Sequence, residues 1–140
     1  MNKLPICILV TALVSQSALA ISQADTEERN DIRYAKNEQA PLEGMLEHYF
    51  EDGRIWEIYY YKQGKMNGEG IVFNRSGHLA SRANYRNGKI HGKSTHWTDA
   101  GLKQWEQFYS DGELLETVFF DPAGKVTKRE VQHATEKPKK

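Results

Sequence analysis

The sequence predicts an all-β fold, an antiparallel β-meander of about eight strands built from 24-residue hairpin repeats, with a short N-terminal segment outside the repeats. Three observations predict it: glycines recur every 24 residues, a second set of glycines punctuates each repeat, and aromatic residues recur in step with them. Periods of 20 to 50 residues indicate stacked supersecondary units, each of which packs on its neighbours.

The glycines and aromatics fall into columns. The opening glycines are Gly44, Gly68 and Gly92. The turn glycines form two sets, Gly53, Gly77 and Gly101, and Gly64, Gly88 and Gly112. The aromatic columns are Tyr49, Phe73 and Trp97, before the first set, and Tyr61, Tyr85 and Tyr109, before the second. Because aromatics at equivalent places on stacked units pack on one another, we expect both columns to be structural.

The turn glycines mark the ends of the strands. Asn87-Gly88 and Asp111-Gly112 favour tight hairpins, and Gln63-Gly64 does so more weakly. The glycines at 53, 77, 101 and 124 fit three-residue loops that end in a residue with positive φ. The expected strands are 45–50, 54–61, 68–74, 78–86, 92–98, 102–109, 113–120 and 125–131.

These loops also predict a register. If every turn closes as a three-residue loop, Tyr49 lies opposite Ile55 and Tyr61 lies opposite Lys65, so odd-numbered residues pair with odd-numbered ones. One face of the sheet would then carry both aromatic columns, and the other face would carry the even-numbered residues.

The even-numbered face supplies the candidate binding residues. Its apolar side chains gather at the N-terminal end of the repeats. Either residues 21–43 cover this surface or it contacts a partner, because exposed apolar patches usually mark interfaces. The candidates are His48, Trp56, Ile58, Tyr60 and Arg82.

The last repeat breaks the pattern. Gly112 and Gly124 are one residue closer than the preceding spacing predicts, and Glu116 stands in place of an opening glycine. Phe120 consequently changes face. A β-bulge would restore its column, or the last hairpin is a degenerate cap of the kind that ends repeat arrays.

The two ends differ from the repeats in composition. Residues 1–20 have the features of a signal peptide: Lys3, an apolar run, and Ala18-Leu19-Ala20 as a cleavage site. We therefore expect an exported protein, periplasmic or secreted; the alternative is a retained interfacial anchor. Residues 21–43 are expected to be a linker or a short helix through Tyr34 that starts near Asp25. Residues 132–140 are expected to be a disordered polar tail.

Composition excludes several functional classes. The only cysteine, Cys7, lies in the signal segment, which leaves no thiol chemistry or disulfide in the mature chain. Without Lys3 the 19 basic residues become 18 against 19 acidic ones, which argues against nucleic acid and makes membrane association weak. No histidines or carboxylates are spaced for a metal or for acid–base catalysis, so we expect no cofactor, metal or enzymatic activity.

The repeat resembles a known family. A skeleton of glycine, an aromatic four residues before a turn glycine, and tyrosine three before the next spans residues 44–131 and is similar to the MORN repeat in its variant form. The resemblance implies one hairpin per repeat and no catalytic residues. Bacterial proteins built from this variant include antitoxins of toxin–antitoxin systems, and the original MORN repeats attach to membranes and proteins.

The repeats and the signal segment together predict an exported, non-enzymatic module that binds another protein. Its specific form is an immunity- or antitoxin-like neutraliser in the cell envelope. The alternative is an envelope structural component attached to membrane or cell wall, and a hydrolase is a distant third. The sequence leaves the oligomeric state open, because a meander has two strand edges.

Overall fold

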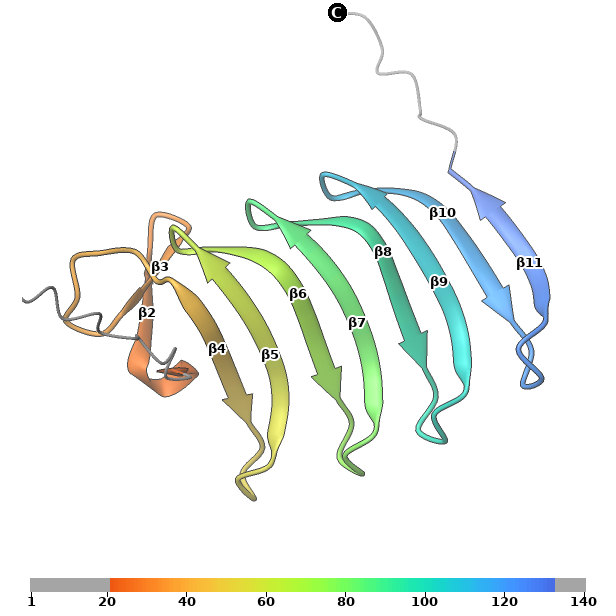
Figure 1. The fold of residues 1–140 in the computed structure, drawn as a ribbon, viewed down its shortest axis with the longest axis horizontal. Coiled ribbons are helices and arrows are strands. Elements are labelled where there is room, and N and C mark those ends of the chain that lie inside the picture. The colour runs from red at the N-terminus through yellow and green to blue at the C-terminus, as the bar shows by residue number, and fades with distance from the viewer. Residues whose placement is uncertain (1–20, 133–140) are drawn as a thin grey trace, which may run out of the picture.

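A computed structural model describes residues 21–132; the expected signal peptide and residues 133–140 of the tail lie outside the described part. The described chain forms one nine-stranded sheet in the order β1-β4-β5-β6-β7-β8-β9-β10-β11, with a separate β2–β3 hairpin at its N-terminal end (Figure 1). The N-terminal elements are β1 (Ile21–Ser22), the 3-10 helix η1 (Gln23–Asp25), β2 (Thr26–Arg29) and β3 (Ile32–Ala35). The meander consists of β4 (Gly44–Tyr49), β5 (Ile55–Lys62), β6 (Lys65–Phe73), β7 (Leu79–Arg86), β8 (Lys89–Trp97), β9 (Lys103–Ser110), β10 (Glu113–Phe120) and β11 (Val126–Val131).

The all-β meander predicted from the repeats is confirmed. Strands β4 to β11 pair in sequence order, each antiparallel to the next, and β1 adds to β4 in parallel. The sheet is a single curved layer in Figure 1. Its stability therefore depends on neighbouring strands and on rows of side chains along each face.

Residues 21–43 differ from the expected linker or helix. Asn30 and Asp31 adopt φ values of 52° and 60° and close the tight β2–β3 hairpin. Both residue types tolerate this left-handed conformation, so the turn between two extended segments prevails over a helix. The hairpin is bonded to the sheet, because Arg33 N–H donates to the Gly64 carbonyl over 2.9 Å and Leu42 N–H donates to the Arg33 carbonyl over 2.8 Å.

The turns are of two kinds. The glycines that end the three-residue loops have positive φ, as predicted: 81° at Gly53, 83° at Gly77, 76° at Gly101 and 80° at Gly124. The other three connections are two-residue turns in which both residues have positive φ. They are Gln63-Gly64, Asn87-Gly88 and Asp111-Gly112. Consequently Lys62 pairs with Lys65 and Tyr61 pairs with Met66, not with Lys65.

The predicted faces are therefore wrong. Tyr49 does pair with Ile55, but a β-bulge follows and His48 pairs with Glu57, so odd-numbered residues lie opposite even-numbered ones along most of the sheet. The two aromatic columns consequently lie on opposite faces. We call the tyrosine face the one that carries Leu46, Tyr59, Tyr61, Tyr85 and Tyr109, and the reverse face the one that carries Ile58, Tyr60, Phe73 and Trp97.

The bulges explain the irregular last repeat. At one point in its pairing with β5, strand β6 contains two more residues than the stretch of β5 that it faces. Strand β8 has the same two-residue excess over β7. Opposite β9, β10 inserts only one, Leu115. This missing residue shortens the last interval, and Phe120 returns to the face of Phe73 and Trp97. A bulge thus restores the column, and β6, β8 and β10 bend visibly along their length (Figure 1).

A single layer buries few side chains completely. Leu46, on the tyrosine face, is 0% exposed, and the other buried apolar residues are Leu42, Ala83 and Val118. The rings of Tyr59 and Tyr85 meet edge to face with centroids 5.7 Å apart. They close over Gly70, where a Cβ atom would lie only 2.7 Å from atoms of both rings. The absence of a side chain at Gly70 therefore lets the two tyrosines meet.

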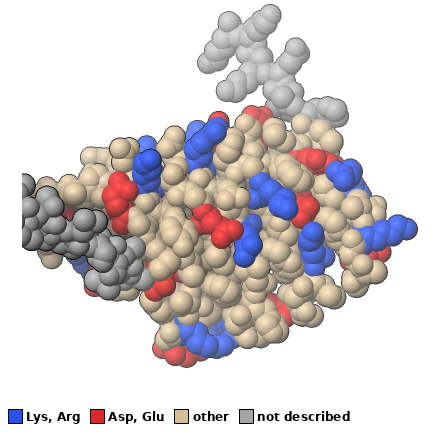
Figure 2. Space-filling model, in the orientation of Figure 1, with Lys and Arg blue, Asp and Glu red and all other residues tan. Residues whose placement is uncertain are grey.

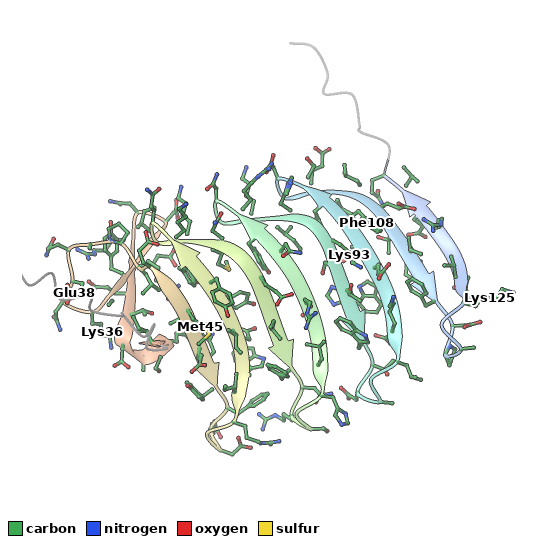
Figure 3. All side chains as sticks on the ribbon, viewed as in Figure 1. Lys36, Glu38, Met45, Lys93, Phe108 and Lys125 are labelled. Carbon is green, nitrogen blue, oxygen red and sulfur yellow. The ribbon has the colours of Figure 1, made fainter. Side chains whose placement is uncertain are left out.

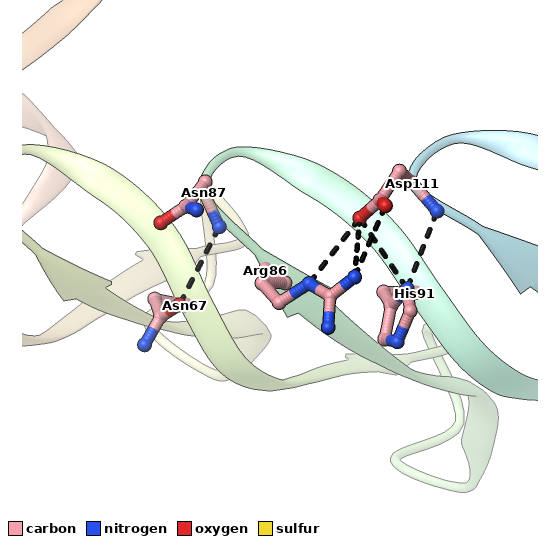
Figure 4. Close-up of polar contacts among 5 residues, drawn as sticks. All are labelled: Asn67, Arg86, Asn87, His91 and Asp111. Carbon is pink, nitrogen blue, oxygen red and sulfur yellow. Dashed lines mark hydrogen bonds and ion pairs between the residues drawn. The ribbon is translucent and has the colours of Figure 1, made fainter.

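The two-residue turns join each repeat to the one before it. Gly64, Gly88 and Gly112 N–H donate to the carbonyls of Leu42, Met66 and Ile90 over 2.8 to 2.9 Å. Side chains one residue further along strengthen the junction. Glu43 accepts from Gln63 N–H at 2.8 Å. At the next two junctions Asn67 accepts from Asn87 N–H at 3.4 Å and His91 from Asp111 N–H at 3.2 Å (Figure 4).

Candidate protein-binding site

Aromatic side chains gather where β4 and β5 meet the first three-residue loop. The ring centroid of Trp56 lies 6.2 Å from that of His48 and 6.1 Å from that of Phe50. Trp56 is nevertheless 40% exposed. The β-bulge at Tyr49 and Ile55 places this tryptophan beside the loop. The ring is held in place by neighbours and still reaches solvent.

Two guanidinium groups flank this aromatic group. The Cζ atoms of Arg54 and Arg75 lie 6.0 and 5.4 Å from the Phe50 ring centroid. Arg54 bonds Asp52 at 2.7 Å, which holds the pKa of the Asp52 carboxyl below its ordinary value, and Arg54 also donates to the backbone carbonyl of Arg75. We call His48, Phe50, Arg54, Trp56 and Arg75 the Trp56 cluster.

On the tyrosine face the cluster ends in a partly buried pair. His48 Nδ1 lies 3.2 Å from a Glu57 carboxylate oxygen. Burial, and then the positive charge of Arg33, lower the pKa of His48, whereas burial raises the pKa of Glu57. Burial thus works against the charged form of both side chains. This side of the cluster presents the rings of His48 and Trp56.

The structure divides the five predicted binding residues between two faces. His48 and Trp56 are in contact, within the Trp56 cluster. Ile58, Tyr60 and Arg82 lie on the reverse face, where Arg82 pairs with Glu69 at 3.2 Å. The expected single even-numbered patch does not exist, because the bulges and two-residue turns change which residues share a face. Residues 21–43 leave Trp56 and the 44% exposed Tyr60 uncovered.

Sequence reasoning missed three members of the cluster. Phe50, Arg54 and Arg75 lie in or beside the loops, and their meeting depends on how two successive loops stack. One signal was available. Arg54 directly follows Gly53 and Arg75 lies two residues before Gly77, so both flank corresponding loop glycines one repeat apart.

The reverse face has a different character. On it, Lys93 and Phe108 lie side by side on β8 and β9 (Figure 3), and Lys93 and Lys103 both pair with Glu106. Figure 2 shows acidic and basic side chains interspersed over the visible surface, with no large region of one sign. Such a surface gives no footprint for a polyanion.

Residues 21–132 contain neither a metal-binding cluster nor a membrane-spanning helix. That part of the chain brings together no group of three His, Cys, Asp or Glu side chains that could hold a metal ion. It contains no helix with the length and hydrophobicity that a membrane span requires.

Comparison with known proteins identifies the repeat. The family model of the MORN repeat variant matches residues 42–63 and 66–87. No curated protein matches the chain. Both matches begin at residues whose carbonyls, on Leu42 and Met66, accept the hydrogen bonds of the turn glycines. The chain therefore carries MORN-variant repeats, which form the first two units of its meander.

Proposed function

We propose that this protein is a non-catalytic module that recognises another protein through the Trp56 cluster. MORN repeats in general are modules that bind proteins or membranes. The observation that carries the proposal is the partly exposed Trp56 ring, packed against His48 and Phe50 beside two arginines. Tryptophan, tyrosine and arginine are the residues that most often dominate the energy of protein interfaces.

The rigidity of the cluster supports this role. The Phe50 loop is closed by two backbone hydrogen bonds, from Phe50 N–H to the Arg54 carbonyl and from Gly53 N–H to the Phe50 carbonyl. Arg54 is fixed by Asp52 and by the next loop. A surface that is ordered before binding loses little conformational entropy on association. We infer a partner segment with an apolar side chain for Trp56 and a carboxylate for Arg75.

The finer proposal concerns place and role. We propose that the protein is exported and neutralises a protein in the cell envelope, as an immunity- or antitoxin-like factor. The apolar segment before Ala18-Leu19-Ala20 supports export. The resemblance of the repeats to those of antitoxin-type proteins motivates the neutralising role. Sequencing the N-terminus of the exported protein should give Ile21; a start at Met1 would contradict export by cleavage.

Partner capture tests the binding surface. Tagged wild-type chain should retain a specific protein from an envelope extract. Trp56→Ala should weaken this capture by about 2 kcal/mol or more while leaving the melting temperature nearly unchanged, as expected of an interface anchor. Tyr60→Ala, which removes a comparably exposed aromatic from the reverse face, is the matched control and should bind normally.

Two results would oppose the proposal. A large loss of stability in Trp56→Ala would mean that Trp56 is a packing residue. Equal capture by wild type and Trp56→Ala would place the interface elsewhere. Binding of the purified chain to vesicles containing anionic lipid, in place of protein capture, would instead favour the envelope-attached structural role.

A further inference from the structure

The two edges of the sheet differ in whether another strand covers them. At the N-terminal end, β1 pairs with the edge of β4, and the β2–β3 hairpin bonds to the Gln63-Gly64 turn. At the other end, no segment among residues 21–132 pairs with the outer edge of β11. The side chains there are well exposed, with Lys128 at 63% and Arg129 at 59%. An uncovered strand edge is a template for pairing with another strand.

The pairing of β11 with β10 determines which backbone N–H and C=O groups remain free at the outer edge. Gln132 N–H donates to the Leu115 carbonyl over 2.8 Å, and Val131 lies opposite Glu116. Backbone hydrogen-bonding groups alternate in direction along an antiparallel strand. The backbone N–H and C=O groups of Lys128 and Glu130 therefore point toward β10. Arg129 and Val131 direct their N–H and C=O groups outward.

We propose that two copies of this chain associate through antiparallel pairing of β11 with β11, about a two-fold axis at Arg129. In this register the outward-directed backbone groups of Arg129 bond to those of Arg129 in the second copy. Val131 reaches the level of Thr127, the extra residue of the β-bulge in β11, so the regular pairing centres on residues 128–130. The interface is isologous, so it closes at the dimer and leaves the capped N-terminal ends outermost.

The side chains of β11 are complementary to themselves in this register. Lys128 of one copy lies directly opposite Glu130 of the other, and the two-fold axis repeats the pair. Both side chains are on the tyrosine face, where they already contact each other within one chain. Opposite charges at directly opposed positions stabilise an antiparallel pair, and like charges destabilise it.

In this register the two Arg129 side chains meet on the reverse face, where each has a carboxylate partner. Arg129 pairs with Glu116 of β10 at 2.7 Å, so each guanidinium enters the interface with its counter-charge beside it. The competing reading is that Lys128 and Arg129 keep the edge unpaired, as edge charges often do. Under that reading Glu130 serves only as the partner of Lys128 within its own chain, whereas the dimer gives it a second lysine across the interface; charge exchange separates the two.

Charge exchange provides the test. Sedimentation of the purified chain over a concentration series should show a monomer that converts to a dimer. Lys128→Glu places Glu opposite Glu130 of the second copy, and Glu130→Lys places Lys opposite Lys128, so each single variant should remain monomeric. An equimolar mixture of the two should dimerise, because every opposed pair is again complementary. The double variant K128E/E130K should dimerise alone.

Circular dichroism should show all variants folded, since both positions are on the surface. Glu69→Lys, which changes a half-exposed charge far from β11, is the control and should dimerise as wild type does. Monomeric wild type at every concentration would overturn the proposal, with the edge charges acting as protection. Dimers of both single variants would overturn the register, as would a mixture that stays monomeric.

Discussion

At the scale of the residue, the tyrosine face depends on size differences between neighbours. Tyr85 packs edge to face on Tyr59, and burial raises the pKa of both phenols, that of Tyr59 most strongly. Gly70 makes room beneath them. The sequence identified Tyr85 as a structural column residue, but Tyr59 and Gly70 lie outside the columns and could not be linked to it without the true register.

Removing the Tyr85 ring should cost stability. Tyr85→Ala is expected to lower the free energy of unfolding by about 2–4 kcal/mol, because a large packed ring is lost and the sheet cannot close around the space. Urea denaturation followed by circular dichroism measures the loss. Tyr60→Ala, on the reverse face and more exposed, should cost clearly less; an equal loss in the two variants would show that Tyr85 is not a packing residue.

Adding one carbon at Gly70 should have a comparable effect for the opposite reason. Gly70→Ala places a Cβ atom 2.7 Å from atoms of both Tyr59 and Tyr85. Overpacking of this kind typically costs about 1–3 kcal/mol. If the clash is the cause, combining Gly70→Ala with Tyr85→Ala should be less destabilising than the sum of the two losses; strict additivity would contradict direct contact.

At the scale of the element, turns and bulges decide the register. Glycine spacing predicted the eight strands and the loops that end in Gly53, Gly77, Gly101 and Gly124, because each local signal has one favoured geometry. The faces could not be predicted, since a one-residue bulge changes the parity of the pairs beyond it in the same ladder and leaves little trace in sequence. The split of His48 and Trp56 from Ile58, Tyr60 and Arg82 is the direct consequence.

The turn at Gly88 tests the two-residue geometry. Gly88 has a φ of 82°, and the nearest atom to an added Cβ would be 3.9 Å away, so space is available and only the backbone conformation opposes a side chain. Gly88→Val should cost about 1–3 kcal/mol, since a β-branched residue is strained there. Gly88→Asn, which tolerates positive φ, should recover much of the loss; an unchanged melting temperature in Gly88→Val would contradict the turn.

At the scale of the whole molecule, two similarly placed histidines couple stability to pH. His48 and His96 occupy the same place in alternate repeats, and burial lowers the pKa of each below its ordinary value of 6.5. His96 stacks on Trp105 with centroids 5.0 Å apart, and its Nε2 lies 3.1 Å from the Ser94 hydroxyl. Neither neighbour carries a charge that would retain a proton.

The sign of the pH dependence follows from linkage. Because the pKa of His96 is lower in the folded state, the unfolded chain binds more protons just below pH 6.5, and stability falls as the pH drops through that window. Glu57, whose pKa is raised by burial, contributes in the opposite sense above pH 4.5. Chemical denaturation at pH 7.5 and 5.5 should show a smaller difference for His96→Gln than for wild type; an identical difference would contradict the coupling.

The pairing order of the strands also determines how the chain reaches its structure. Each of β5 to β11 pairs with the strand that precedes it, across a connection of a few residues, and β1 with β4 is the one distant pairing in the sheet. A chain whose contacts are local in sequence closes only short loops, which favours rapid folding. Folding can begin at any hairpin and extend in both directions. The pairing of β1 with β4 can form before or after the hairpins.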